Sequence, residues 1–116
     1  MPGKYEIKRA QNGEYYFNLK AANGEIILTS EMYKAKAGAQ NGIESVKTNS
    51  PQEAQYERKA SSSGKSFFVL KAANHEVIGR SEMYESEASR DNGIKSVKTN
   101  GPSADIVDAA SGEGGQ

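Results

Sequence analysis

The sequence predicts an α+β fold built by tandem duplication of a unit of three strands and one helix. In this fold one antiparallel sheet carries two helices on one face, with pseudo-twofold symmetry. The first observation is that the chain aligns with itself at an offset of 51 residues, with 26 identities in the 50 pairs between residues 5–54 and 56–105. The second is that the spacing of apolar residues changes from two to nearly four within each copy. The third is that a unit of about 50 residues is too small for a stable core, so the copies should share one.

Three strands are expected at the start of the first copy, at Tyr5 to Arg9, Glu14 to Lys20 and Glu25 to Thr29. Polar and apolar residues alternate in the first two, and the third holds three consecutive apolar residues. Asn12-Gly13 and Asn23-Gly24 are typical turn sequences. The matching strands of the second copy are expected at Tyr56 to Lys59, Ser66 to Lys71 and Glu76 to Arg80.

A helix is expected from about Ala35 to Thr48, because Ala39, Ile43 and Val46 are spaced by four and three residues. In the second copy Ile94 and Val97 repeat the apolar pair, and Ser86 is a candidate N-cap. Gly42 and Gly93 fall inside these helices, where glycine costs about 1 kcal/mol relative to alanine. Their presence predicts close approach of each helix to the sheet. Pro51 and Pro102 then end the helices.

We expect residues 1–107 to form a single domain, with repeats at about 4–54 and 55–107. Joining the units edge to edge extends the sheet and merges two helix-covered faces into one core. Ala104 to Val107 is apolar enough for a short strand. Residues 108–116 are polar and rich in glycine, which predicts a disordered C-terminal tail.

Composition and charge argue against several kinds of partner and site. The 15 basic and 15 acidic side chains cancel, so no strong overall field favours nucleic acid or membrane. Cysteine is absent, which excludes disulfides, thiolate metal ligands and cysteine nucleophiles. The N-terminal segment has no apolar stretch long enough for an export signal or a membrane span. We therefore expect a cytoplasmic protein that does not contact membranes.

Three segments occur twice, and together they resemble a known family. They are Leu-Lys-Ala-Ala-Asn at 19–23 and 70–74, Ser-Glu-Met-Tyr at 30–33 and 81–84, and Asn-Gly-Ile-x-Ser-Val-Lys-x-Asn at 41–49 and 92–100. This combination resembles the YegP-like family of uncharacterised bacterial proteins in its tandem-repeat form, over nearly the whole chain from Tyr5 to Pro102. The resemblance implies one antiparallel sheet with a terminal strand exchanged between units, and single-unit relatives that dimerise. It implies no activity and no site residue.

No catalytic constellation is found among the residues themselves. His75 replaces a turn glycine of the first copy, and its position favours a turn role over a general base or metal ligand. Gly64-Lys65-Ser66 lacks the upstream glycine of a phosphate-binding loop and leads into a strand, which favours a hairpin connection. Glu31 and Glu82 repeat symmetrically, so we expect them to have a structural role, such as a hydrogen bond at helix entry, rather than to act as an acid–base pair. We expect no enzyme activity, cofactor or metal.

The sheet face turned away from the helices is the candidate binding surface. By alternation it carries Tyr16, Asn18, Lys20, Phe67, Val69 and Lys71. Such a patch favours a protein or peptide contact in a non-catalytic binding module. Single-stranded nucleic acid is the alternative function, because bases stack on aromatic rings while lysines meet phosphates. Self-association through the same face is a further alternative. A purely structural role in cross-strand pairs is favoured over nucleic acid. Tyr33 and Tyr84 are expected to fill the ends of the core. The protein is expected to be a monomer in which the two copies form a pseudo-dimer, and the sequence does not identify its binding partner.

Overall fold

The computed structural model describes residues 3–110 of the chain. Each copy holds three strands and one helix of 14 residues, and a short 3₁₀ helix and a seventh strand complete the fold. Within residues 3–110 no helix is long and apolar enough to cross a membrane. The elements are β1 (Lys4–Arg9), β2 (Tyr15–Lys20), β3 (Ile26–Ser30), α1 (Lys36–Asn49), η1 (Glu53–Gln55), β4 (Tyr56–Ala60), β5 (Ser66–Lys71), β6 (Val77–Arg80), α2 (Glu87–Asn100) and β7 (Asp105–Asp108).

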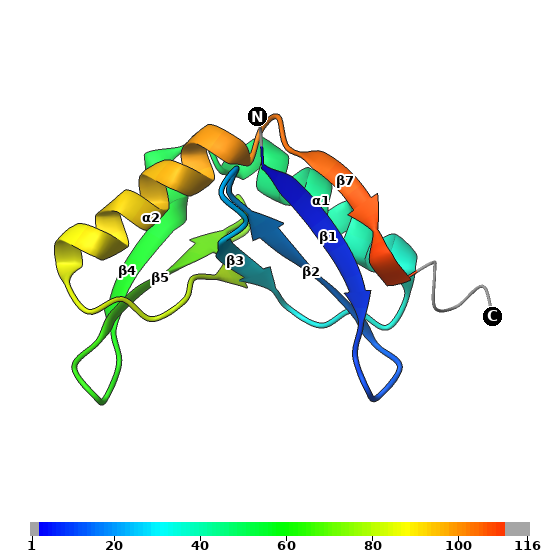
Figure 1. Ribbon diagram of the computed structural model, residues 1–116, viewed down its shortest axis with the longest axis horizontal. Coiled ribbons are helices and arrows are strands. Elements are labelled where there is room, and N and C mark those ends of the chain that lie inside the picture. Colours follow the sequence, from blue (N-terminus) through cyan, green and yellow to red (C-terminus); the bar gives the residue numbers. More distant parts are fainter. Residues whose placement is uncertain (1–2, 111–116) are drawn as a thin grey trace.

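One seven-stranded sheet runs through both copies in the order β4-β5-β6-β3-β2-β1-β7. The copies join where β3 pairs with β6, through Thr29 opposite Arg80 and Ser30 opposite Gly79. Both helices lie on the same side of this sheet (Figure 1). The predicted fold class, a duplicated unit with one sheet and two helices on one face, is confirmed.

The sheet differs from the prediction in one pairing. β7 lies beside β1 of the first copy and runs parallel to it, whereas the strands from β4 through β1 pair antiparallel with their neighbours. The strand exchange implied by the resemblance is therefore present and one-sided, and it makes the sheet mixed (Figure 1). The reason is connectivity: β7 follows α2 directly and reaches β1 in the same direction.

The predicted disordered tail begins too early. Asp108 is the last residue of β7 and forms an ion pair with Lys36 of α1, and Ala110 is 3% exposed. Ala110 packs into the core, which holds this end of the chain in place. The rest of the predicted tail, residues 111–116, lies outside the described residues.

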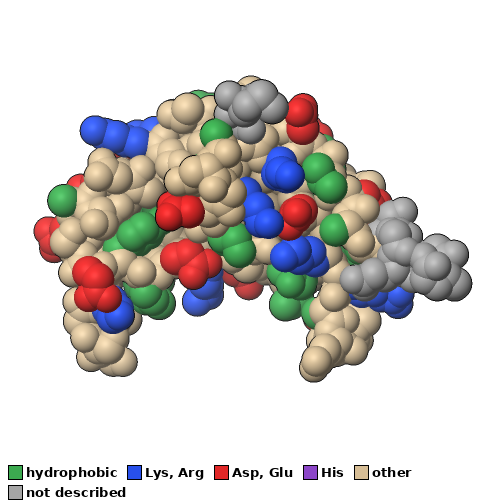
Figure 2. All heavy atoms as spheres, viewed as in Figure 1, with side chains coloured by type: hydrophobic (Ala, Val, Ile, Leu, Met, Phe, Trp, Pro, Cys, Tyr) green, Lys and Arg blue, Asp and Glu red, His purple; other side chains and the backbone are tan. Residues whose placement is uncertain are grey.

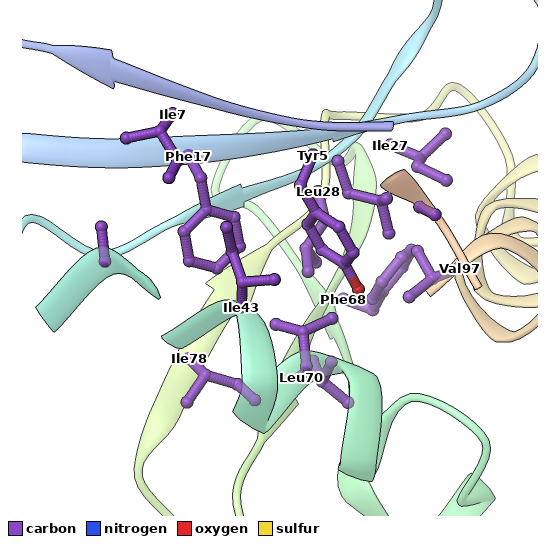
Figure 3. Packing of buried hydrophobic residues seen from close by; sticks show 14 of the residues in the cluster. Tyr5, Ile7, Phe17, Ile27, Leu28, Ile43, Phe68, Leu70, Ile78 and Val97 are labelled. Carbon is purple, nitrogen blue, oxygen red and sulfur yellow. The ribbon is translucent and has the colours of Figure 1, made fainter. Parts of the chain in front are cut away.

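A single hydrophobic core lies between the sheet and the two helices. α1 contacts β2 of its own copy and also β5 and β6 of the other, and α2 contacts β5 together with β2 and β3. Side chains from both copies consequently converge in one cluster (Figure 3). Its largest fully buried members are Tyr5, Phe17, Phe68, Ile7, Leu19, Leu28, Ile43, Leu70 and Ile94.

The helix glycines confirm the predicted close approach of helix to sheet. An added Cβ at Gly42 would lie 2.4 Å from the Tyr33 hydroxyl, and one at Gly93 would lie 2.5 Å from the Tyr84 hydroxyl. Tyr33 also stacks on Phe17 with ring centroids 6.4 Å apart. Both tyrosines pack against the core, as expected, and glycine is required in each helix because a tyrosine occupies the space beside it.

Local signals for turns and caps mostly agree with the structure. His75 has a φ of 72°, which confirms its turn role, and the Ser86 side chain caps α2 by accepting a hydrogen bond from the Ser89 amide. Gly64 has a φ of 88° in the hairpin between β4 and β5. The repeated glutamates do not cap the helices, whose N-caps are Ala35 and Ser86. Glu31 lies 4.0 Å from Arg80 instead, and Glu82 lines a surface pocket, because the helices begin several residues later.

Equivalent positions of the two copies meet along the pseudo-twofold axis, and there the residues differ. Thr29 pairs with Arg80. An added Cβ at Gly79 would lie 2.8 Å from Leu28 Cγ. An added Cβ at Gly101 would lie 2.3 Å from Ser50 Oγ, at the adjoining C-terminal ends of the two helices. Each small residue is therefore matched to a larger one at the equivalent position of the other copy.

Two tyrosines fasten the first strand of each copy to the end of a helix. The Tyr5 hydroxyl donates to the Gly101 carbonyl at 2.6 Å, and the Tyr56 hydroxyl donates to the Ser50 carbonyl at 2.7 Å. Both carbonyls belong to residues at the C-terminal end of a helix, where intrahelical partners are lacking. Burial raises the pKa of both hydroxyls above the ordinary range of tyrosine.

Candidate functional site

The sheet face opposite the helices, called here the open face, is continuous across both copies. Strand pairing aligns one residue from each of six strands in a single row, in the order Glu57, Val69, Arg80, Thr29, Asn18 and Glu6. Directly opposite residues in a sheet project from the same face. The row therefore joins the two sets of predicted binding residues, which the sequence places on separate copies.

The six predicted residues share this face but differ in exposure. Tyr16, Lys20, Phe67 and Lys71 are half-buried. Asn18 is 4% exposed and Val69 is 3% exposed, and Asn18 also donates a hydrogen bond from Nδ2 to Thr29 Oγ1 at 2.9 Å. Alternation identifies the face correctly but does not report the burial of these two residues. Asn18 and Val69 offer little contact area.

Each lysine of the predicted surface is held by a glutamate from the neighbouring strand. Lys20 Nζ lies 3.0 Å from Glu6, and Lys8 lies 3.6 Å from the same carboxylate. The second copy repeats this arrangement around Glu57, with Lys71 at 2.6 Å and Lys59 at 3.6 Å. Hydrogen bonds from Lys20 and Lys71 lower the pKa of Glu6 and Glu57 respectively, which keeps both carboxylates ionised at neutral pH.

Two exposed methionines extend the apolar part of the open face. Tyr33 and Tyr15 exchange backbone hydrogen bonds, so the antiparallel register places Met32 opposite Tyr16. The matching bridge between Tyr84 and Ser66 places Met83 opposite Phe67. Met32 is 53% exposed and Met83 is 50% exposed. We call these two cross-strand pairs, Tyr16 with Met32 and Phe67 with Met83, the contact pairs.

Sequence reasoning missed the methionines because both lie beyond the predicted strand ends. The backbone pairing continues past β3 and β6 as single bridges, which no alternation pattern reveals. One signal was available in the sequence. Methionine stands at the same place in both copies of Ser-Glu-Met-Tyr, one residue from a core tyrosine. A large apolar residue next to a buried one in an extended segment points to the opposite face.

Basic and acidic side chains both lie on the open face. Arg80, at the centre of the row, is 57% exposed and lies 4.0 Å from Glu31. The ion pairs of this face join five cations to three carboxylates, and strand register adds Lys4 and Asp105 opposite each other. Apolar, acidic and basic patches alternate over the surface seen in Figure 2 and do not merge into one large apolar area.

A pocket of about 470 Å³ opens at the junction of the two copies. Gly24, Glu25, Ile26 and Ile27 of the first copy line it, together with Glu82 and Tyr84 of the second. Burial raises the pKa of the Tyr84 hydroxyl, and the nearby charges of Glu82 and Glu25 raise it further. The pocket thus has an apolar wall and a negative field.

Comparison with known proteins agrees with this architecture. The family model described as a domain of unknown function, DUF1508, matches residues 10–57 and again residues 61–108. The UPF0339 protein YegP of Yersinia pestis is 61% identical over 106 residues, covering 91% of this chain and 95% of that protein. The chain belongs to the UPF0339 family. A UPF0339 protein of Acinetobacter baylyi is 60% identical over 108 residues, covering 93% of this chain and 97% of its own length.

Two solved structures of UPF0339 proteins share the fold. The solution structure of YegP from Escherichia coli has a TM-score of 0.90 at 51% identity and covers 95% of each chain. The solution structure of the Shewanella oneidensis protein has a TM-score of 0.89 at 55% identity, covering 95% of this chain and 93% of that one. YegP of Escherichia coli is described as a protein of unknown function. The UPF0339 family is uncharacterised, so function is argued from the surface of the chain itself.

Proposed function

We propose that this UPF0339 protein is a non-catalytic binding module that holds a protein or peptide segment against its open face. The two contact pairs carry the proposal. Tyr16 and Phe67 offer aromatic surface beside the exposed Met32 and Met83. Methionine is flexible and polarisable and adapts to apolar partners of different shape, which suits a contact surface.

The charges around the contact pairs favour a segment that mixes apolar and acidic residues. The ion pairs beside the contact pairs join five cations to three carboxylates, and Arg80 is exposed at the centre of the row. Complementary charge raises association rates and excludes partners of like charge. Apolar side chains of the segment would contact Tyr16, Phe67 and the methionines, while its carboxylates would lie near Arg80.

Single-stranded nucleic acid fits this surface less well. Aromatic rings beside lysines favour it, since bases stack on rings while ammonium groups meet phosphates. Lys20 and Lys71, however, already pair with Glu6 and Glu57 at 3.0 and 2.6 Å. A phosphate would have to displace a carboxylate or approach it closely, which weakens the interaction.

Photo-crosslinking tests the proposal directly. A photoreactive phenylalanine analogue would replace Tyr16 in one variant and Phe67 in another, and crosslinked products would be identified by mass spectrometry. Thr48 and Thr99 are the matched controls, because they are exposed at equivalent positions of the two helices, away from the open face. We expect the same partner from positions 16 and 67 and not from the controls. Crosslinking at the helix positions equal to that at the open face would contradict the proposal.

A second experiment distinguishes a protein partner from single-stranded nucleic acid. Fluorescence anisotropy of a labelled single-stranded oligonucleotide at low salt should show no binding by the wild-type chain. Salt-sensitive binding that weakens when Lys20 and Lys71 are both replaced by alanine would favour nucleic acid instead. Loss of the crosslinked partner in a Tyr16→Ala/Phe67→Ala variant that unfolds like wild type would support the protein contact.

A further inference from the structure

The first strands of the two copies, β1 and β4, differ in whether another strand covers their outer edge. At the β1 edge, β7 pairs in parallel with Lys4–Ile7, and Ile7 is fully buried. At the other edge β4 pairs only with β5 among the described strands, and no strand lies beyond it in the sheet order. An unpaired edge is a template for pairing with another chain. Pseudo-twofold symmetry makes β4 the counterpart of β1, so its outer edge matches the edge that β7 covers.

Three positions that hold apolar or neutral residues beside β1, whose edge β7 covers, hold charged residues beside β4, whose edge is uncovered. Ile7 and Ala39 of the first copy are both fully buried. Their equivalents at the offset of 51 residues are Arg58 and Arg90, and the neighbouring Gln40 becomes Asp91. These positions lie on the first strand and the first turns of the helix in each copy. The copies thus differ at three positions at the end of the sheet where only the first copy is covered by β7.

The charged residues of the second copy form one connected cluster. Arg58 Nη1 donates to Glu53 at 2.7 Å, and Arg58 Nε donates to Asp91 at 3.0 Å. Arg90, which is 9% exposed, donates to Asp91 at 3.1 Å, and Lys98 donates to Glu53. We call these five residues the edge cluster. It links β4, η1 and α2 at the end of the sheet that has no seventh strand.

Each charged group of the edge cluster has a partner of opposite charge within the cluster. Hydrogen bonds from Lys98 and Arg58 lower the pKa of Glu53, and the hydrogen bond from Arg58 lowers the pKa of Asp91. Both acids therefore stay ionised at neutral pH, and the Arg58 guanidinium has two carboxylate partners. A side chain with both of its ionic partners supplied internally gains little from an incoming strand and loses solvation if it is covered.

We infer that the edge cluster closes the β4 edge to strand addition by a second copy of this chain. Arg58 does so by placing a charge where Ile7 places an apolar side chain at the covered edge. Charged side chains at an exposed strand edge are a general protection against edge-to-edge association. The strand that is kept from pairing with β4 is the β4 strand of a second copy.

Symmetry explains why a second copy is the relevant partner. Two copies meeting through the same strand form a closed twofold contact, and antiparallel pairing of β4 with itself about its central residue would set Arg58 opposite Arg58. Like charges directly opposite in a sheet are destabilising. With isoleucine at that position, the same pairing would bring two apolar side chains together instead.

The test restores the residues of the first copy at the open end of the full-length chain. The variant Arg58→Ile/Arg90→Ala/Asp91→Gln should associate, and its apparent affinity should rise at least about tenfold over wild type. Sedimentation velocity over about a hundredfold range of concentration measures this, since association obeys mass action. Amide hydrogen exchange should show new protection at the β4 amides that do not pair with β5.

Controls separate edge closure from added hydrophobicity. Lys59→Ile places the same side chain on β4 but on the open face, and it should leave the chain monomeric. Arg58→Lys keeps the charge and should also stay monomeric, whereas Arg58→Ile alone should associate. This single pair of variants decides the matter if the triple variant does not fold. The inference is overturned if Arg58→Ile remains monomeric with wild-type exchange at β4, if Lys59→Ile associates as strongly, or if the wild-type chain already dimerises with protected β4 amides.

Discussion

Among single residues of the core, Ser50 has a buried hydroxyl that lacks a hydrogen-bond partner. Ser50 is fully buried, and its Oγ is the single buried side-chain oxygen or nitrogen without a hydrogen-bond partner among residues 3–110. Ser30 is also buried, but its hydroxyl accepts from the Phe17 amide and donates to the Glu31 carbonyl. The same side chain is therefore satisfied at one site and unsatisfied at the other.

Ser50→Ala should raise the free energy of unfolding by about 1 kcal/mol, because a buried hydroxyl without a partner costs desolvation energy. Ser50 has helical backbone angles, which alanine adopts readily. Ser30→Ala is the matched control and should lower stability by about 1–3 kcal/mol, since it leaves the Phe17 amide unpaired. Urea unfolding of both variants measures this. Equal effects of the same sign would contradict the assignment.

The buried tyrosines predict a loss of stability in alkaline solution. Burial raises the pKa of the Tyr5 hydroxyl, with smaller contributions from Tyr56 and Glu44, and burial likewise raises that of Tyr56. In the unfolded chain both ionise near pH 10. The folded state then holds more protons, so stability is full below about pH 10 and declines as the pH rises above it.

Unfolding free energies measured between about pH 8 and about pH 11 test this. The Tyr5→Phe/Tyr56→Phe variant should be less stable at neutral pH, because it loses two buried hydrogen bonds, and its stability should depend less on alkaline pH. A pH dependence identical to that of wild type would show that other groups are responsible.

At the scale of elements, the sequence predicts what is local and misses what depends on pairing between distant segments. The hairpin turns, both helices and six strands follow from periodicity and turn residues. The parallel alignment of β7 with β1 joins residues about 100 positions apart, and no local pattern encodes its direction. Asn18 and Val69 fall on the predicted face, yet their burial depends on neighbouring strands. Met32 was missed because pairing continues past the end of β3.

The contact between β3 and β6 predicts strong coupling of Leu28 with Gly79. Gly79→Ala should be destabilising, because its Cβ would lie 2.8 Å from Leu28 Cγ. Leu28→Ala alone should cost about 2–5 kcal/mol by leaving a cavity. In the double variant the new methyl group enters space that Leu28 has vacated. We expect a coupling energy of about 0.5–3 kcal/mol in a double-mutant cycle. Additive effects would mean that β3 and β6 adjust independently.

At the scale of the whole molecule, the two copies complete one another. α1 rests on β5 and β6, and α2 rests on β2 and β3. The tyrosine hydrogen bonds cross between copies in the same reciprocal way. Separating the copies would expose the paired edges of β3 and β6 and uncover the face of each helix that contacts the other copy.

Residues 1–54 expressed alone should therefore lack the cooperative unfolding of the full chain. The fragment retains three strands and one helix but loses the β5 and β6 surface on which α1 packs. Cores of this size seldom supply more than about 3–5 kcal/mol. Thermal unfolding followed by circular dichroism compares the two. A monomeric fragment that melts as sharply and at the same temperature as the intact chain would refute the shared core.

The unlike pairs on the pseudo-twofold axis also bear on the history of the chain. In a dimer of identical subunits, a position on the axis always meets its own copy, so Leu28 would press on Leu28 and Arg80 would confront Arg80. In a single polypeptide that restriction is absent, and the residues that meet on this axis differ in size between the two repeats. Such divergence is difficult to reverse. Neither repeat is now suited to pair with an identical copy of itself, so the two repeats depend on being encoded together.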